Sequence, residues 1–268
     1  MTRASGERYM DETVLHKAGA ALAHARKTAS QVPPPWPEAP ASLEQAYALQ
    51  RAAIAALGGG LAGWKIGATG KDHQARLKTD RPFFGPIPET DRHEANAQNG
   101  VALPFRPGTR GVECEIAFRM ARALPRREAP YGRDEVKAAV GSLHPALEVV
   151  GTRVVSDGLP DVRLAIADYG LNMAFLPGAA VADWHELDLS SIAARCLVDG
   201  QEKATGTGVL VLGDPLQALV WLADNGPGLE AGQWVSSGTL TGITPVAAGS
   251  LAEGDFGALG RVSVRFMA

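Results

Sequence analysis

The segment "GVECEIAF", residues 111–118, constrains the fold most strongly, because large apolar residues occupy every second position and two glutamates lie between them. The first set is Val112, Cys114, Ile116 and Phe118, and the second is Glu113, Glu115 and Ala117. A period of two is typical of a β-strand, whose successive side chains point to opposite faces of a sheet. The segment is therefore predicted to be a strand that carries two carboxylates on the same face.

The N-terminal part of the chain shows the spacing of helices instead. A first helix is expected to have Asp11 as its N-cap and an apolar stripe that starts at Val14. A second is expected to begin at Ser42 and to end at the glycines of residues 58–60. The segment "QVPPPWPEAP" between them cannot be helical, because proline has no backbone donor and biases its neighbour to extended backbone.

After about residue 100 the pattern changes to strands and tight turns. Asp199-Gly200 is predicted to form the bend of a hairpin, since both residues tolerate positive φ. Only two short helices are expected here, one from about Asp134 to Val140 and one from Asp214 to about Asn225. The sequence thus predicts a mainly helical region over residues 1–95 and a β-rich catalytic region over residues 96–268.

Composition excludes several classes of function. The 268 residues carry a net charge of −3, which gives no electrostatic reason to expect nucleic acid or an anionic membrane as a partner. No apolar run is long enough to span a bilayer, and the N-terminus lacks the apolar core of a signal peptide. The two cysteines, Cys114 and Cys196, form no CxxC pair. We therefore expect a cytoplasmic protein.

Glu148 stands in "HPALEVVG", a run that is apolar on both faces, as in a buried strand. A buried, ionised carboxylate costs several kcal/mol unless it is paired or binds a metal. Arg153 is a possible partner, which keeps a purely structural role open. Three carboxylates from two strands nevertheless suit a hard cation with oxygen ligands, and Mg²⁺ or Mn²⁺ would fit. Glu113, Glu115 and Glu148 are therefore the candidate metal ligands.

Six segments occur in an order that resembles the fumarylacetoacetate hydrolase superfamily, and more closely its 2-oxopent-4-enoate hydratase and 4-oxalocrotonate decarboxylase branch. They are "GWKIGATG", "RPFFGPI", "VECEIAF", "HPALEVVGTR", "ADYGLNMAFLPG" and "VSSGTLTGITPV". The resemblance implies homo-oligomers and an α+β fold, in which a small helical N-terminal part packs on a mixed β roll. In that branch three glutamates hold a divalent metal, whereas the hydrolase branch typically has an aspartate where this chain has Glu148.

The activity that the resemblance implies is metal-dependent addition of water to a 2-hydroxy-2,4-dienoate, giving a 4-hydroxy-2-oxo acid, as in the catabolism of aromatic compounds. The ion would act as a Lewis acid on the negative charge that develops during proton transfer. Decarboxylation of a 4-oxalocrotonate-type acid stays open as an alternative. So does C–C bond hydrolysis of an acylpyruvate, whose histidine base would come from the N-terminal part, where His16 and His24 match no motif. A scaffold or binding protein with a decayed site is the non-enzymatic alternative.

The resemblance also assigns further residues to the site. Lys65 of "GWKIG" matches an active-site lysine that could neutralise the substrate carboxylate or relay a proton; without that match it would be a surface lysine. Asp168 and Asn172 match a loop that approaches the active site and are candidate catalytic residues. Ser237 and Thr239 match a segment that supplies hydroxyl donors to the substrate, although such residues in Gly-rich turns often bond only to backbone.

Phe83 departs from the pattern of the family, since several hydratases of this branch carry an aspartate immediately before Phe-Gly. An acid there could position the water or relay the proton, and a phenylalanine can do neither. Asp80 is a possible substitute. The alternative is that Phe83 lines a drier pocket, which would suit an apolar substrate tail.

Overall fold

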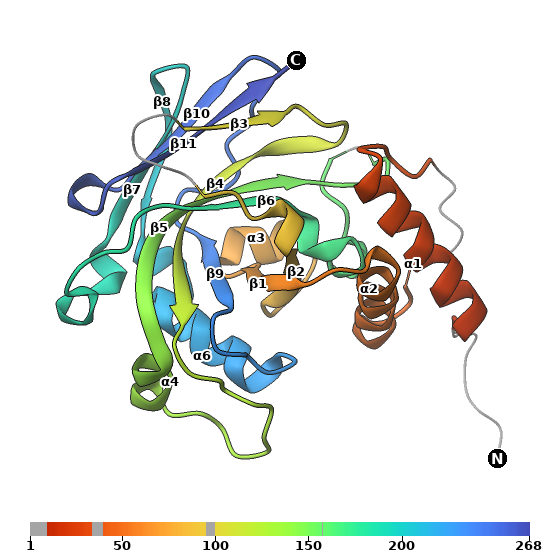
Figure 1. Cartoon of the computed structure of the whole chain (residues 1–268), viewed down its shortest axis with the longest axis horizontal. Coiled ribbons are helices and arrows are strands. Elements are labelled where there is room, and N and C mark those ends of the chain that lie inside the picture. The colour runs from red at the N-terminus through yellow and green to blue at the C-terminus, as the bar shows by residue number, and fades with distance from the viewer. Residues whose placement is uncertain (1–9, 34–39, 95–99, 157) are drawn as a thin grey trace.

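The computed structural model describes residues 10–33, 40–94, 100–156 and 158–268 (Figure 1). Its helices are α1 (Glu12–Lys27), α2 (Leu43–Leu57), α3 (Lys71–Arg76), α4 (Arg133–Ala139), α5 (Val162–Ala167) and α6 (Pro215–Asn225). Its strands are β1 (Leu61–Gly67), β2 (Phe83–Pro88), β3 (Val101–Pro104), β4 (Thr109–Met120), β5 (Val140–Gly151), β6 (Asn172–Pro177), β7 (Ala193–Val198), β8 (Gln201–Thr207), β9 (Trp234–Thr239), β10 (Leu251–Asp255) and β11 (Arg261–Met267).

The strands form two mixed sheets. One has six strands in the order β2-β1-β9-β4-β5-β6, and the other has five in the order β3-β11-β10-β7-β8. Residues from both sheets, such as Leu147 of β5 and Val264 of β11, belong to one buried apolar cluster. Figure 1 shows α1 and α2 together at one side of these sheets. The predicted α+β fold, with N-terminal helices on a curled mixed sheet, is confirmed.

Local signals placed most of these elements correctly. The Asp11 carboxylate accepts a hydrogen bond from the Val14 amide at the start of α1, and the Ser42 hydroxyl accepts one from the Gln45 amide at the start of α2. The predicted strand at residues 111–118 lies within β4. Asp199-Gly200 forms the bend between β7 and β8, and both residues have positive φ.

The prediction of only two helices after residue 100 is wrong, because α5 follows Asp161, whose side chain caps it; six residues are too few to show a helical period. The proposed division at residue 95 stays a prediction, and residues 95–99 lie outside the described chain, as do residues 34–39 of the proline-rich segment. Strands β1 and β2 precede that division yet share a sheet with β4, β5, β6 and β9.

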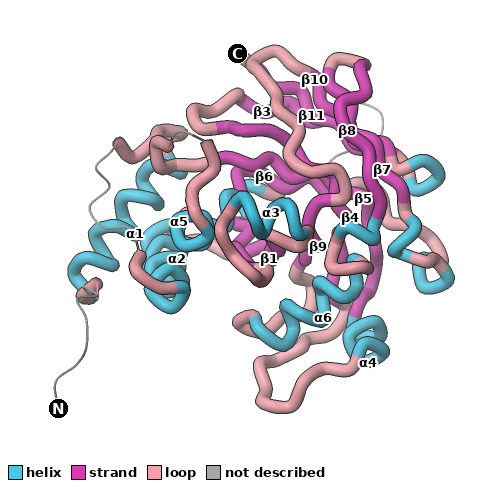
Figure 2. Tube along the Cα trace, turned by 180° about the vertical axis from the view of Figure 1, so that it is seen from behind, coloured by secondary structure: helices cyan, strands magenta, loops and turns pink. Residues whose placement is uncertain are grey.

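None of the helices in the described ranges combines the length and the apolar character that crossing a bilayer requires. Seen from behind, α3 lies between helices α2 and α5 on one side and the five-stranded sheet on the other (Figure 2). This short helix therefore covers the region where β1, β4 and β9 meet.

Candidate metal centre and active site

The three candidate glutamates lie together on neighbouring antiparallel strands. Glu113 of β4 is directly opposite Glu148 of β5, and Glu115 follows two residues later on the same face of β4. Each offers a carboxylate oxygen that lies within 4.8 Å of the oxygens of the other two. Their exposed fractions are 6% for Glu113 and 0% for both Glu115 and Glu148. The sheet register thus gathers three carboxylates in the interior of the protein.

Such a cluster is electrostatically unfavourable without a cation. Burial raises the pKa of Glu113 to about 7, with Lys65 opposing this shift and Glu148 adding to it. Burial also raises the pKa of Glu115 well above its ordinary value, and the charges of Glu148 and Glu113 raise it further. The cluster therefore resists full ionisation unless positive charge is supplied.

The hydrogen bonds around Glu115 show that the cluster fits a metal ion. Its Oε2 accepts hydrogen bonds from the Ser236 hydroxyl and from the Gly238 amide at 3.1 Å. Its Oε1 is buried and has no hydrogen-bond partner among the described residues. One oxygen held in place and the other free is the arrangement of a carboxylate ligand. The residues present therefore suit a divalent cation with oxygen ligands.

Lys65 enters the cluster from β1. Its Nζ lies 3.0 Å from Glu148 Oε2, and only 3% of the residue is exposed. Burial lowers the pKa of Lys65, but the charges of Glu148, Glu113 and Glu115 outweigh burial and leave the pKa above its ordinary value. The prediction that Lys65 belongs to the site, and not to the surface, agrees with this geometry.

A strained turn holds the Lys65 stem in place. Tyr169, Gly170 and Leu171 have consecutive positive φ values of 53°, 65° and 66°. A Cβ at Gly170 would lie 2.8 Å from the Cα of Gly85 and 3.2 Å from Cδ of Lys65. Only glycine allows this approach, so the strain of the turn is linked to the position of the lysine.

Asn172, directly after that turn, contacts a candidate ligand. Its Nδ2 donates a hydrogen bond of 2.9 Å to Glu148 Oε1. Its carbonyl oxygen accepts hydrogen bonds of 2.8 Å from both Arg26 and Arg153. Arg26 comes from α1 and also donates to Asp91 at 2.9 Å. Asn172 therefore orients Glu148, and the N-terminal helix supports that contact.

Asp168 pairs with Arg153, which in turn donates a hydrogen bond to the Asn172 carbonyl oxygen. Its two carboxylate oxygens accept hydrogen bonds from the backbone amide and from Nε of Arg153, and its side chain is 1% exposed. Arg153 is thus paired with Asp168, and not with Glu148 as the sequence left open. A catalytic role for Asp168 stays a prediction, and its contacts are those of a positioning residue.

Strand β9 contributes two hydroxyl groups to the site, that of Thr239, which the sequence predicted, and that of Ser236, which it did not. Thr239 lines the pocket described below, while its Oγ1 accepts hydrogen bonds from the amides of Thr241 and Gly242. Ser237 is fully buried, and among the described residues its hydroxyl has no partner. Ser236, which the sequence reasoning missed, is the serine that bonds to Glu115.

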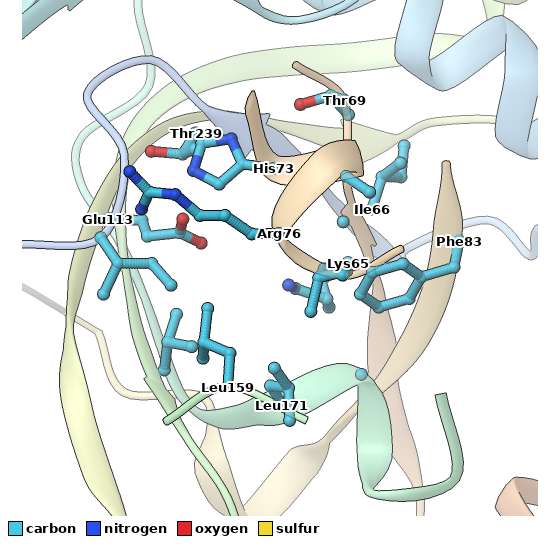
Figure 3. A pocket seen from close by; sticks show the side chains of 16 residues that line it. Lys65, Ile66, Thr69, His73, Arg76, Phe83, Glu113, Leu159, Leu171 and Thr239 are labelled. Carbon is cyan, nitrogen blue, oxygen red and sulfur yellow. The ribbon is translucent and has the colours of Figure 1, made fainter. Parts of the chain in front are cut away.

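A pocket open to solvent leads to Glu113 and Lys65. Figure 3 shows these two side chains facing it together with Phe83, Leu171 and Thr239. Helix α3 adds two residues that sequence reasoning missed, namely His73 and Arg76. Burial, followed by the charges of Arg76 and Lys65, lowers the pKa of His73, so its imidazole is neutral at pH 7.

Phe83 and Asp80, the two residues at the departure from the family pattern, lie in different environments. Phe83 is 2% exposed, lines the pocket, and has its ring centroid 5.7 Å from Lys65 Nζ. Asp80 is exposed and pairs with the neighbouring Arg81 at 2.8 Å. Asp80 therefore lies outside the pocket wall and does not replace an acid at position 83.

The other histidines that the sequence analysis considered, His144, His16 and His24, lie away from the pocket wall. His144 bonds to the Ser142 hydroxyl and the Gly178 carbonyl oxygen and packs against Trp234, which is a structural role. His16 and His24 are exposed on α1 and do not line the pocket.

Chemically, the site joins a cation-binding cluster, a buried ammonium group and a pocket of mixed polarity, which suits proton transfer on a small anionic substrate.

The chain is similar to known proteins over most of its length. The model of the fumarylacetoacetate hydrolase C-terminal family matches residues 13–266. A 2-keto-4-pentenoate hydratase of Paraburkholderia xenovorans is 31% identical, over 84% of each chain. A 2-oxo-hept-4-ene-1,7-dioate hydratase of Escherichia coli is 30% identical, over 84% of this chain and 87% of that protein.

The fold is shared with a solved structure. The 4-oxalocrotonate decarboxylase of Pseudomonas putida G7, complexed with magnesium and adipate, superposes with a TM-score of 0.84, at 23% identity. The match covers 97% of this chain and 100% of that chain. The resemblance inferred from the six sequence segments is confirmed, and the chain belongs to the fumarylacetoacetate hydrolase C-terminal family.

Proposed function

We propose that the protein is a lyase that adds water to a 2-hydroxy-2,4-dienoate and releases a 4-hydroxy-2-oxo acid, with Mg²⁺ or Mn²⁺ held by Glu113, Glu115 and Glu148. The observation that carries the proposal is the buried cluster of these three carboxylates beside the Lys65 ammonium group. The relatives at 30–31% identity, whose names are those of hydratases, support the reaction class.

Each group has a task that its position allows. When bound, the cation supplies Lewis acidity that stabilises negative charge on the 2-oxygen of the substrate. Lys65 Nζ holds a proton next to the cluster and can deliver it to the substrate or balance the substrate carboxylate. Asn172 keeps Glu148 in its rotamer, and the Thr239 hydroxyl, which already accepts two amide hydrogens, has its own proton free to donate.

Decarboxylation is the second candidate, and Phe83 is the observation that favours it. Hydration needs a group that positions water at C4, and no carboxylate stands at residue 83, where an aromatic ring lines the wall instead. Loss of carbon dioxide passes through a similar enolate and needs no positioned water. If the reaction is hydration, the neutral imidazole of His73, which also lines the pocket, is in a position to hold the water in place of a carboxylate at residue 83.

The test mixes the protein and Mg²⁺ with 2-hydroxypenta-2,4-dienoate and follows both the loss of the dienol and the formation of product. We expect 4-hydroxy-2-oxopentanoate in step with dienol loss. Ketonisation without this product would refute the hydratase assignment and leave the enolate chemistry standing. No reaction with any dienol or acylpyruvate would refute both, and a metal analysis that finds no bound divalent ion would then favour a scaffold with a decayed site.

Two expectations from the sequence accompany this proposal. A cytoplasmic location and a homo-oligomeric state stay predictions, the second testable by light scattering on the purified protein. The preferred ion is decided by comparing activity after reconstitution with Mg²⁺ and with Mn²⁺.

A further inference from the structure

The pocket has two cationic side chains, and only one of them pairs with the glutamate cluster. Lys65 contacts Glu148 at 3.0 Å. Arg76, the last residue of α3, lines the same pocket and is exposed. Among the residues that the structure describes, no carboxylate forms an ion pair with Arg76. Its guanidinium group is therefore available to an anion that enters the pocket.

Arg76 and the cluster differ in depth. The three glutamates are almost completely buried, whereas Arg76 stands where the pocket opens to solvent. Figure 3 shows α3 holding Arg76 and His73 across the pocket from Lys65 and Phe83. A substrate whose 2-oxo acid end lies at the cluster therefore extends its other end toward the opening, where Arg76 is the permanent charge.

The wall between these two ends is mostly apolar. It is formed by Leu77, Phe83, Val150, Leu159, Leu171 and Ile243. A hydrocarbon chain gains free energy from contact with such a wall, and a carboxylate gains none. Polar groups at both ends of an apolar middle match a short chain that carries an acid at each end.

We propose that Arg76 binds a second carboxylate at the far end of the substrate, so that the site selects diacids over monoacids of the same length. The inference rests on the proposed function for the binding of the 2-oxo acid end and adds a specificity-determining residue to it. It also modifies the alternative in which Phe83 suits an apolar substrate tail, because Phe83 then contacts the middle of the substrate and not its end.

The test compares two ligands that differ only at the far end, 2-oxoadipate and 2-oxohexanoate, in calorimetric titrations with saturating Mg²⁺. Neither has a 4-ene, so neither can be hydrated, and the result does not depend on turnover. We expect 2-oxoadipate to bind at least about fivefold more tightly, a factor that a partly exposed charge pair can supply and that salt weakens. Arg76→Gln should remove this preference while leaving the affinity for 2-oxohexanoate unchanged.

Two further variants control the measurement. Arg76→Lys keeps the charge without the planar fork and should retain part of the preference. Lys78→Gln removes an exposed charge two residues further on, outside the pocket wall, and should leave the preference intact. Equal affinities in the unaltered protein, or an equal loss for both ligands in Arg76→Gln, would overturn the inference. If neither acid binds, the 2-oxo acid site itself is refuted, whereas absent hydration with an intact preference would refute only the proposed reaction.

Discussion

Replacement of Glu113 by glutamine should stabilise the metal-free protein while destroying its metal site. The pKa of this carboxyl group rises from 4.5 to about 7 in the folded protein. Each unit corresponds to about 1.4 kcal/mol, so at pH 8 the ionised group costs the folded state about 3 kcal/mol relative to the unfolded chain. Glutamine has nearly the same shape and no charge, so Glu113→Gln should recover up to that amount.

The sign of the pH dependence follows from the same shift. Between pH 4.5 and about 7 the folded protein keeps a proton on Glu113 that the unfolded chain has lost. The stability of the unaltered protein therefore falls as pH rises through this window, and the advantage of the variant grows until it levels off above about pH 7. At pH 5 it should shrink to less than about 1 kcal/mol.

The assay is thermal denaturation in the presence of a chelator at pH 5 and at pH 8, with Glu186→Gln at an exposed position as the matched control. At pH 8 the expected gain corresponds to roughly 6 °C or more in Tm for a chain of this size. Added Mg²⁺ should reverse the order, because it stabilises the unaltered protein by binding to its folded state alone. A variant that is less stable than the parent at pH 8 without metal, or a gain that ignores pH, would refute the reasoning.

Three further changes separate the roles assigned to the site. Glu115→Gln or Glu148→Gln should weaken Mg²⁺ binding more than about a hundredfold by calorimetry, because each removes a ligand; unchanged affinity in both variants would contradict the site assignment. Lys65→Met should lower turnover by about 10² to 10⁴ with little change in metal affinity, and wild-type steady-state kinetics would return Lys65 to a bystander role. Asp168→Asn should lower stability by about 3–5 kcal/mol through the broken pair with Arg153, and the rate per folded, metal-loaded molecule should change far less; a collapse of that rate would make Asp168 catalytic.

The members of the glutamate cluster can be predicted from the sequence, because each of them stands in a segment with a recognisable local pattern. The alternation of residues 111–118 places Glu113 and Glu115 on one face of a strand, and the apolar run around Glu148 marks a buried charge that needs a partner. The register that sets Glu113 opposite Glu148 is not visible in either segment. It follows from the pairing of β4 with β5, which depends on the whole sheet.

The residues that sequence reasoning missed depend on features that no local sequence pattern shows. Ser236, and not Ser237, reaches Glu115, because Gly238 has a φ of 108° and the register of β9 against β4 shifts between Glu115 and Ala117. A one-residue interruption reverses which side chains face a site, and simple alternation cannot reveal it. Arg26 supports Asn172 from 146 residues away in the sequence, a contact that no local pattern encodes.

The arrangement separates the chemistry of the site from its selectivity. The cluster and Lys65 come from β4, β5 and β1, central strands of one sheet whose positions are fixed by pairing on both sides. Arg76 and His73 come from α3, a helix of six residues with no side-chain cap at its N-terminus. A change in α3 can therefore alter what the pocket opening recognises without moving a ligand of the cation, whereas a change in β4 or β5 shifts the cluster itself. On this basis, differences in substrate tail among chains with the same three glutamates should lie in the segment between β1 and β2, which in this chain contributes Arg76 to the pocket.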